Sequence, residues 1–177
     1  MSGLLVREMT LADCERVAEI RVGGWQSAYR GIIPQSYLDA MSVPEDAERR
    51  RRRFLESTQS GGTVTNLVAV QDGEIVGWVC HGPYRDGEVP TGDAELYAIY
   101  VDPDRLGAGA GRALIGESTR RCTAAGHPRI YLWVLKENMR ARRFYESSGF
   151  RADGAGEPFE VDGVLVPEVR YVRELTA

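Results

Sequence analysis

The segment Val101–Leu114 constrains the fold more than any other part of the sequence. It reads VDPDRLGAGAGRAL, with glycines at 107, 109 and 111, and it follows the apolar run Ala94–Val101. A glycine inside a helix costs about 1 kcal/mol relative to alanine, so three at a helix start indicate a close approach to bare backbone. A helix N-terminus offers free N–H groups and partial positive charge, which suit a phosphate or pyrophosphate.

Two common phosphate-binding motifs do not fit this segment. A P-loop needs Gly–Lys–Ser/Thr, but Gly111 is followed by Arg112 and Ala113. The dinucleotide fingerprint needs a glycine at the sixth position, which is Arg112 when counted from Gly107. A ligand-free turn and a nucleotide-phosphate binder remain as alternatives, and the missing lysine argues against the second.

The rest of the chain predicts a mixed α/β sheet within one domain over residues 1–177. Asp72–Gly73 and Asp162–Gly163 each separate apolar runs, as in β-hairpins. The unit 94–101, helix, 129–134 predicts a parallel crossover, and residues 85–93 predict a polar loop. The expected strands cover 4–7, 63–70, 75–84, 94–101, 129–134 and 166–172, and the expected helices begin at Thr10, Pro34 and Ser42, lie within 106–125, and run from Asn138 to about Ser148.

Composition excludes several function classes. The net charge of −4 gives no bulk attraction to nucleic acid or to acidic membranes. Three cysteines, far apart and without a CxxC pair, together with only two histidines argue against a zinc site or a disulfide framework. The N-terminus lacks the pattern of a signal peptide, so a soluble cytoplasmic protein is expected. The run Arg49–Arg53 is expected to be a solvated helix surface, because five consecutive residues cannot share one face.

Two motifs resemble those of the GNAT acetyltransferase superfamily. The coenzyme A signature reads Gln/Arg–x–x–Gly–x–Gly/Ala after a strand that ends Val–x–Pro. Here Val101–Pro103 matches the strand end, Gly109 and Gly111 match the two glycine positions, and Leu106 stands at the Gln/Arg position.

The second motif lies in residues 130–150, which read IYLWVLKENMRARRFYESSGF. Its matching residues are Asn138, Ala141, Phe144, Tyr145, Gly149 and Phe150. Asn138 and Tyr145 are two helical turns apart and therefore lie near one face. The resemblance covers residues 63–173 well and the N-terminal third more loosely.

The resemblance implies a mostly antiparallel sheet with helices on both faces and a splayed parallel strand pair that binds acetyl-CoA. The implied activity is acetyl transfer to a primary amine by direct attack in a ternary complex, without a metal. The pantetheine arm would pair with the backbone of Ile99, Tyr100 and Val101, and an N–H near Ile99 would polarise the thioester. The pyrophosphate would meet the backbone of Leu106, Gly107, Ala108, Gly109, Ala110, Gly111 and Arg112.

Two side chains of the second motif are implied to contact the cofactor. Tyr145 would protonate the leaving sulfur, although a packed aromatic is the alternative from the residue alone. Asn138 would contact the cofactor, and it also suits a helix N-cap.

The acceptor side is predicted less specifically. Glu95 is the candidate base, with a solvated strand-end charge as the alternative. Simple alternation places Glu95 on one face with Tyr97 and Ile99, and a bulge typical of the family would shift that phase. Trp25, Tyr29 and Tyr84 are candidate walls of the acceptor site, and a core role is the alternative for Trp25.

Several functions remain open on the sequence alone. The acceptor can be a small molecule or a peptide amine. A non-catalytic acyl-CoA sensor or partner module with the same fold is the alternative function. Dimers are common in this superfamily, so a homodimer is one open arrangement.

Overall fold

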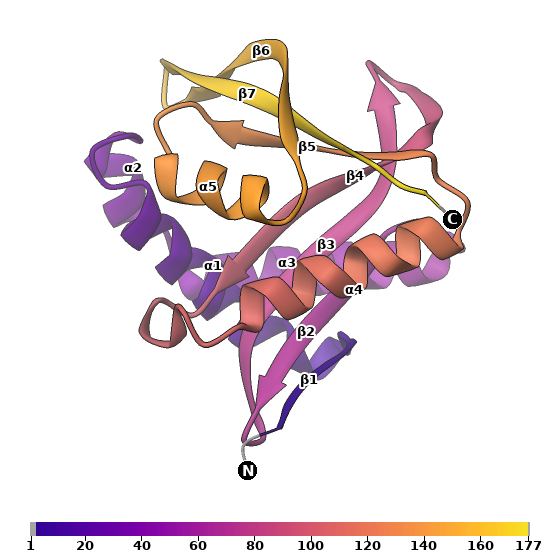
Figure 1. Cartoon of the computed structure of the whole chain (residues 1–177). Helices are drawn as coiled ribbons and strands as arrows, with labels where there is room; N and C mark the ends of the chain where they lie inside the picture. Colours follow the sequence, from indigo (N-terminus) through magenta and orange to yellow (C-terminus); the bar gives the residue numbers. More distant parts are fainter. Residues whose placement is uncertain (1–2, 177) are drawn as a thin grey trace.

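A seven-stranded sheet runs through the chain, with helices on both faces (Figure 1). The structure is a computed structural model that describes residues 3–176. The strand order is β1-β2-β3-β4-β5-β7-β6, and β4 with β5 is the parallel pair among antiparallel neighbours. The strands are β1 Leu4–Glu8, β2 Thr65–Gln71, β3 Glu74–Asp86, β4 Val89–Val101, β5 Arg129–Leu135, β6 Arg151–Val161 and β7 Val164–Glu174. The predicted fold class is confirmed.

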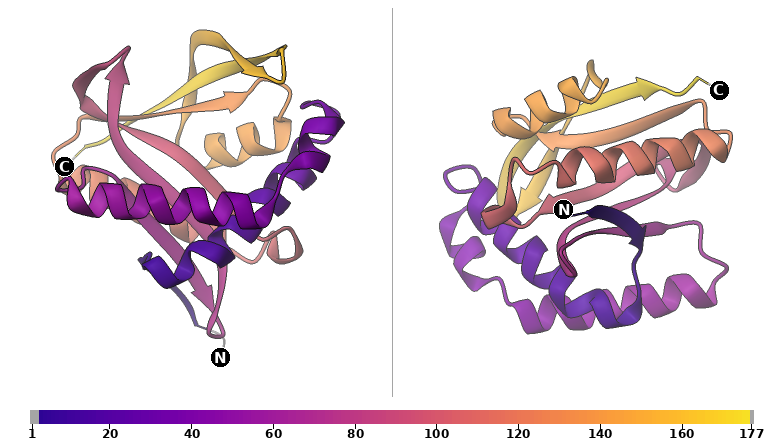
Figure 2. Two further views of the ribbon diagram at one scale, coloured as in Figure 1. Left: turned by 180° about the vertical axis from the view of Figure 1, so that it is seen from behind. Right: turned by 60° about the horizontal axis from the view of Figure 1, so that its bottom comes forward.

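The helices form two layers that enclose the sheet. One layer holds α1 and α3, and the opposite layer holds α4 and α5, as the two views of Figure 2 make clear. The helices are α1 Cys14–Ala28, α2 Gln35–Ala40, α3 Val43–Gln59, α4 Ala110–Ala124 and α5 Met139–Ser147, with short 3-10 turns at Leu11–Asp13 and Pro103–Arg105. No helix within residues 3–176 has both the length and the apolar character needed to cross a lipid bilayer.

Local sequence signals explain where many elements begin. Ser42 Oγ accepts a hydrogen bond from the Glu45 N–H and caps α3. Both Asp–Gly turns have positive φ at their two central residues, 53° at Asp72 and 82° at Gly73 in the first. This backbone matches the right-handed twist of the flanking strands, and both predicted hairpins are confirmed.

One predicted boundary is wrong, and another is confirmed. Residues 85–93 form a loop only at their tip, because Arg85 pairs with Pro90 and Asp86 with Val89 across a turn. The residues of this hairpin end are polar because they are exposed to solvent. Polar residues can still pair as strands, so their polarity does not indicate a loop. The helix expected within 106–125, after a glycine-led start, is confirmed: it runs from Ala110 to Ala124 and follows a left-handed residue at Gly109.

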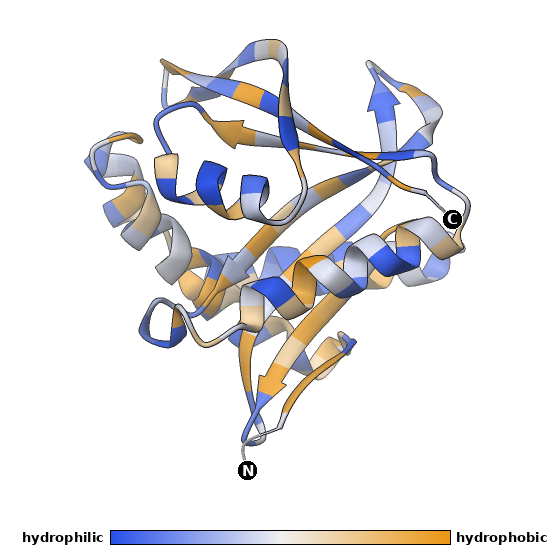
Figure 3. Cartoon of the chain, in the orientation of Figure 1, coloured by the Kyte–Doolittle hydropathy of each residue, from blue (hydrophilic) through white to orange (hydrophobic). Residues whose placement is uncertain are grey.

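Apolar side chains form clusters on both sides of the sheet. Figure 3 shows apolar residues concentrated along β2 and β3, with further apolar positions along β4 and α4. The larger cluster includes Leu114 of α4, Ile130 of β5 and Phe150, and it holds α4 and α5 against the sheet. A second cluster, around Trp25 and Val166, joins the end of α1 to the β6–β7 hairpin. This last contact closes one end of the cavity described below.

The arginine run on α3 is more than a solvated surface. The Arg50 side chain is only 11% exposed, and its guanidinium lies 4.4 Å from the ring centroid of Trp78. Asp46 is buried and pairs with Arg21, Arg49 and Arg50. The expectation of a uniformly solvated run is therefore wrong at Arg50, which covers the core.

A buried histidine leads to a prediction about pH and stability. His81 Nδ1 lies 2.9 Å from Ser118 Oγ beneath α4, and burial lowers the His81 pKa to about 4. The unfolded chain then binds a proton more readily than the folded one between about pH 4 and 6.5, so stability falls as pH falls through that window. The His81 contribution to this loss between pH 7 and pH 5 is expected to be about 2 kcal/mol.

Urea unfolding of the wild type and the variants at the two pH values measures this contribution as a difference between proteins, because the raised pKa values of Glu95 and Glu168 shift stability in the opposite direction in all of them. His81→Gln should remove most of it, whereas His127→Gln, at a histidine that bonds Gly92 O near the surface, should keep it. An unchanged loss in His81→Gln would contradict the assignment.

Candidate active site

The parallel strands β4 and β5 separate shortly after they pair. Their register joins Ala94 with Ile130 and Glu95 with Tyr131, and no later pair of the two strands is joined within residues 3–176. Beyond this point, β4 continues to pair with β3 and β5 with β7, so each keeps a free backbone edge toward the gap. A cavity of about 990 Å³ occupies the opening.

A bulge in β4 sets which side chains face which layer. Cys80 pairs with Ala98 and His81 with Leu96, so Tyr97 is an extra residue on β4. Leu96 and Ile99 therefore pack in the same cluster, although simple alternation would place these two residues on opposite faces. Simple alternation, which would place Glu95 on the same face as Ile99, does not hold, and the bulge given as the alternative is present. Glu95 lines the cavity.

The glycines after β4 have two separate physical roles. Gly107 and Gly109 have φ of 83° and 92°, which favour glycine, and an added Cβ at either would meet open space. An added Cβ at Gly111 would lie 3.3 Å from the Phe144 ring, so this glycine allows α4 to pack against α5.

The start of α4 presents free backbone donors. Ala113 N–H bonds Gly109 O, which leaves the N–H groups of Ala110, Gly111 and Arg112 without a partner inside the helix. These three residues line the cavity. Free donors, a helix N-terminus and open space above Gly109 together suit a pyrophosphate.

The side chains of α5 enter the same cavity. Asn138 Oδ1 accepts a bond from the Ala141 N–H, so the predicted cap is present and the NH₂ group stays available. Tyr145 lines the cavity and is 9% exposed. No hydrogen bond within residues 3–176 involves the Tyr145 hydroxyl. Every fully buried side-chain polar atom in that range has a partner, so this unpartnered hydroxyl is not fully buried. The hydroxyl is therefore open to the cavity.

The protonation state of Tyr145 follows from its surroundings. Burial, and to a smaller extent the neighbouring Tyr100, raise the Tyr145 pKa above that of free tyrosine. At neutral pH the side chain is a phenol, which can donate a proton but not accept one from an amine.

Aromatic residues of α1 close the far wall of the cavity. Trp25 Nε1 donates to the Tyr100 hydroxyl at 2.8 Å, and the Tyr29 and Tyr100 hydroxyls lie 3.3 Å apart. Gly24 permits this contact, since an added Cβ would lie 3.0 Å from the Tyr100 ring. Trp25 is buried and also lines the cavity. It therefore packs in the core and forms part of the cavity wall at the same time.

Three carboxylates line the cavity: Glu95 of β4, Glu157 of β6 and Glu168 of β7. Burial raises the Glu95 pKa to about 7, with smaller contributions from the Glu157 and Glu168 charges. Burial also raises the Glu168 pKa to about 7, and Glu157 adds to this shift. A carboxyl with this pKa is partly protonated near pH 7 and can exchange a proton with an amine.

Two predicted site residues lie outside the cavity lining. Tyr84 packs against Tyr131, with ring centroids 4.7 Å apart, and its hydroxyl accepts a bond from Arg170. Ala108 lies within the glycine turn, but its neighbours supply the lining. The other predicted residues all line the cavity.

Several lining residues have no signal in the sequence motifs. Glu157, Phe159 and Glu168 come from the β6–β7 hairpin, whose turn was predicted but whose position beside β5 was not. The alternation of Glu157 and Phe159 is a weak signal that both share one face.

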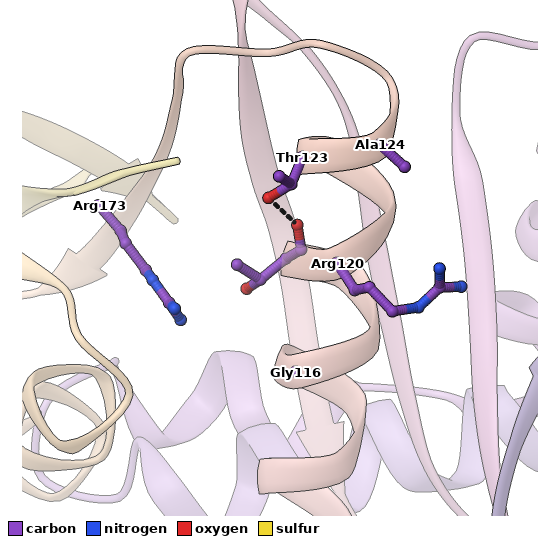
Figure 4. A pocket seen from close by; sticks show the side chains of 6 residues that line it. Gly116, Arg120, Thr123, Ala124 and Arg173 are labelled. Carbon is purple, nitrogen blue, oxygen red and sulfur yellow. Dashed lines mark hydrogen bonds between the residues drawn. The ribbon is translucent and has the colours of Figure 1, made fainter. Parts of the chain in front are cut away.

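A second hollow of about 460 Å³ lies between α4 and the end of β7 (Figure 4). Arg173 and Arg120 line it, and the figure shows Arg173 extending from β7 toward α4. Both are engaged, Arg173 with Ser148 O and Arg120 with Glu117. It shares no lining residue with the larger cavity, and we assign it no role. Among residues 3–176, no three His, Cys, Asp or Glu side chains gather to hold a metal ion.

Known proteins share this sequence pattern and this fold. Residues 25–150 match the family described as the Acetyltransferase (GNAT) family. An uncharacterized N-acetyltransferase, YuaI of Bacillus subtilis, is 31% identical over 93% of this chain and 89% of its own. Spermidine N(1)-acetyltransferase of Thermoplasma acidophilum is 21% identical over 84% of this chain and 88% of its own.

Solved structures agree on the fold. PaiA N-acetyltransferase of Thermoplasma acidophilum, in complex with coenzyme A, has a TM-score of 0.76 at 19% identity, covering 97% of this chain and 99% of that one. YncA of Salmonella typhimurium, with its cofactor acetyl-CoA, has a TM-score of 0.76 at 22% identity, covering 99% and 96%.

Proposed function

Because the chain belongs to the GNAT acetyltransferase family and is an N-acetyltransferase, we propose that it transfers acetyl from acetyl-CoA to a primary amine in the cavity between β4 and β5. The observation that carries this proposal is a single cavity that holds both the free N–H groups of the α4 start and the open hydroxyl of Tyr145. These groups are suited to a phosphate-bearing thioester and to its leaving sulfur, respectively.

The chain's own residues fit acetyl-CoA along the length of the cavity. The free backbone edge of Ile99–Val101 can form hydrogen bonds with the pantetheine amides, in the way that it would with an additional β-strand. The N–H groups at the start of α4 hold the pyrophosphate, and Arg112 and Arg140 line the same cavity with positive charge. Asn138 contributes its free NH₂ group. When bound, acetyl-CoA supplies the activated acetyl carbon.

The reaction requires two proton transfers, and the cavity supplies a group for each. The amine nitrogen bonds to the acetyl carbon as the carbon–sulfur bond breaks. Glu95 takes the proton that the amine loses, directly or through water. Tyr145 gives its proton to the departing sulfur, whose thiolate is otherwise a poorer leaving group at neutral pH.

The base role of Glu95 predicts a pH dependence. Glu95 must be ionised to accept a proton, so kcat/KM should rise as pH rises through about 7, the pKa to which burial brings it. Glu168→Gln removes a nearby charge that raises this pKa, so the rising limb should move to lower pH. With a monoamine acceptor, which has no second ammonium for Glu168 to bind, Glu95→Gln should lower kcat/KM about 100-fold and abolish the limb.

Initial rates from pH 5.5 to 9 measure this dependence. Glu160→Gln, on β6 outside the cavity lining, is the matched control and should leave the profile in place. A Glu95→Gln profile with the same limb would assign the limb to the amine itself and remove Glu95 as base.

A panel of amines tests the proposed function directly. Thiol release from acetyl-CoA should accelerate when a primary amine is added, and the acetylated amine should appear in equal amount. The alternative, an acyl-CoA sensor or partner module, predicts tight CoA binding without transfer to any amine. The open Tyr145 hydroxyl favours the enzyme, because a sensor has no need of an acid at that position.

A further inference from the structure

Charge is segregated along the cavity. Its cationic side chains, Arg105, Arg112 and Arg140, come from the turn before α4, from α4 itself and from α5. Its carboxylates come from β4 before the bulge and from the β6–β7 hairpin. In Figure 1 that hairpin lies above α5 and the turn before α4 lies below it. One part of the cavity therefore suits an anionic ligand and another suits a cationic one.

The hairpin carboxylates form an unfavourable pair in the structure as it stands. Glu157 and Glu168 are directly opposite each other in the β6–β7 register, where like charges destabilise a sheet. No ion pair within residues 3–176 joins Glu95, Glu157 or Glu168 to an arginine or lysine, and the charges of Glu157 and Glu168 act on Glu95. The nearby Arg170 bonds Asp153 and Tyr84. A cationic ligand at this position would relieve the repulsion.

The walls beside these carboxylates are apolar. Phe159 of β6 lies 6.3 Å from Trp25 between ring centroids, and Trp133 and Leu135 of β5 line the same part of the cavity. Such walls favour a flexible hydrocarbon segment and offer few hydrogen bonds to a hydroxyl-rich ligand.

From these observations we propose that the acceptor is a small aliphatic diamine or polyamine. Its reacting nitrogen lies at Glu95, its hydrocarbon segment packs on the aromatic wall, and its second ammonium lies between Glu157 and Glu168. This inference rests on the proposed acetyltransferase function and narrows its substrate class. The second ammonium stays protonated and takes no part in the chemistry.

Isosteric acceptors test the proposal. 1,4-Diaminobutane and n-pentylamine have the same number of heavy atoms but differ in the second charge, and 4-aminobutyrate carries a negative charge there. The diamine should show a kcat/KM at least about 10-fold above that of the monoamine, the size expected for one charged hydrogen bond. The aminocarboxylate should be the poorest of the three.

Variants assign the preference to the hairpin. Glu157→Gln and Glu168→Gln should each reduce the diamine-to-monoamine ratio to below about 3, mainly through KM for the diamine. Glu160→Gln, on the same strand but outside the cavity lining, should keep the ratio.

The outcomes distinguish a failure of the proposed acceptor class from a failure of the proposed acetyltransferase function. Equal kcat/KM for diamine and monoamine, or a diamine preference that survives both substitutions, overturns the acceptor class while acetyl transfer stands. Transfer to no amine at all, with CoA still bound, overturns the proposed function and this inference with it.

Discussion

Replacing Tyr145 by phenylalanine is expected to lower kcat about 100-fold while the Kd for CoA changes less than about 2-fold. The substitution removes one hydroxyl and keeps the ring that packs against Phe150 and Tyr171. Because that hydroxyl forms no hydrogen bond within residues 3–176 and opens to the cavity, its loss should not disturb the fold. Proton donation to the departing thiolate is then the property that is lost.

Steady-state kinetics and calorimetric CoA titration together measure this effect. Tyr37→Phe removes a hydroxyl from a partly exposed tyrosine of α2 outside the cavity lining, and it should leave both constants unchanged. Unchanged kcat in Tyr145→Phe would remove its acid role. A large rise in the Kd for CoA would instead make Tyr145 a binding residue.

Replacing Gly109 by alanine is expected to weaken CoA binding more than about 10-fold. The added Cβ enters the open space next to the free N–H groups of the α4 start, where the pyrophosphate would lie. It also strains a residue with φ of 92°, at a cost of about 1–2 kcal/mol in the free energy of unfolding.

Gly126 offers a matched control at the other end of α4. It has φ of 85° and open space around an added Cβ, but it lies outside the cavity lining. Gly126→Ala should therefore show a similar loss of stability with no change in CoA affinity. Equal CoA affinity in the two alanine variants would place the cofactor elsewhere.

The residues proposed to bind the cofactor can be identified from sequence because the features that mark them are local. Gly107 and Gly109 are needed for left-handed backbone within the binding turn itself, and Gly111 is needed for the contact with Phe144. Asn138 and Tyr145 lie on one short helix. Such signals depend on residues close together in the chain, and they indicate the ligand before any tertiary contact is known.

The acceptor side depends on long-range register instead. Glu168 lines the cavity because β7 pairs with β5 so that Leu135 lies opposite it. Glu157 then follows from the β6–β7 register. The face of Glu95 depends on the bulge at Tyr97, which changes the alternation without any proline or glycine at that residue. No local pattern reports these pairings, and the position of Tyr84 against Tyr131, outside the cavity lining, depends on the same long-range contacts.

Mass spectrometry during turnover tests the central claim most directly. The protein is mixed with acetyl-CoA and with 1,4-diaminobutane or n-pentylamine. The masses of the amine product and of the intact protein are measured at intervals. The proposed direct transfer predicts acetylated amine in equal amount to released CoA, with no acetylated protein on the way and with intersecting initial-rate lines for the two substrates. Tight CoA binding without acetylated amine, or an acetyl-protein that appears during turnover and then passes its acetyl group to the amine, would contradict it.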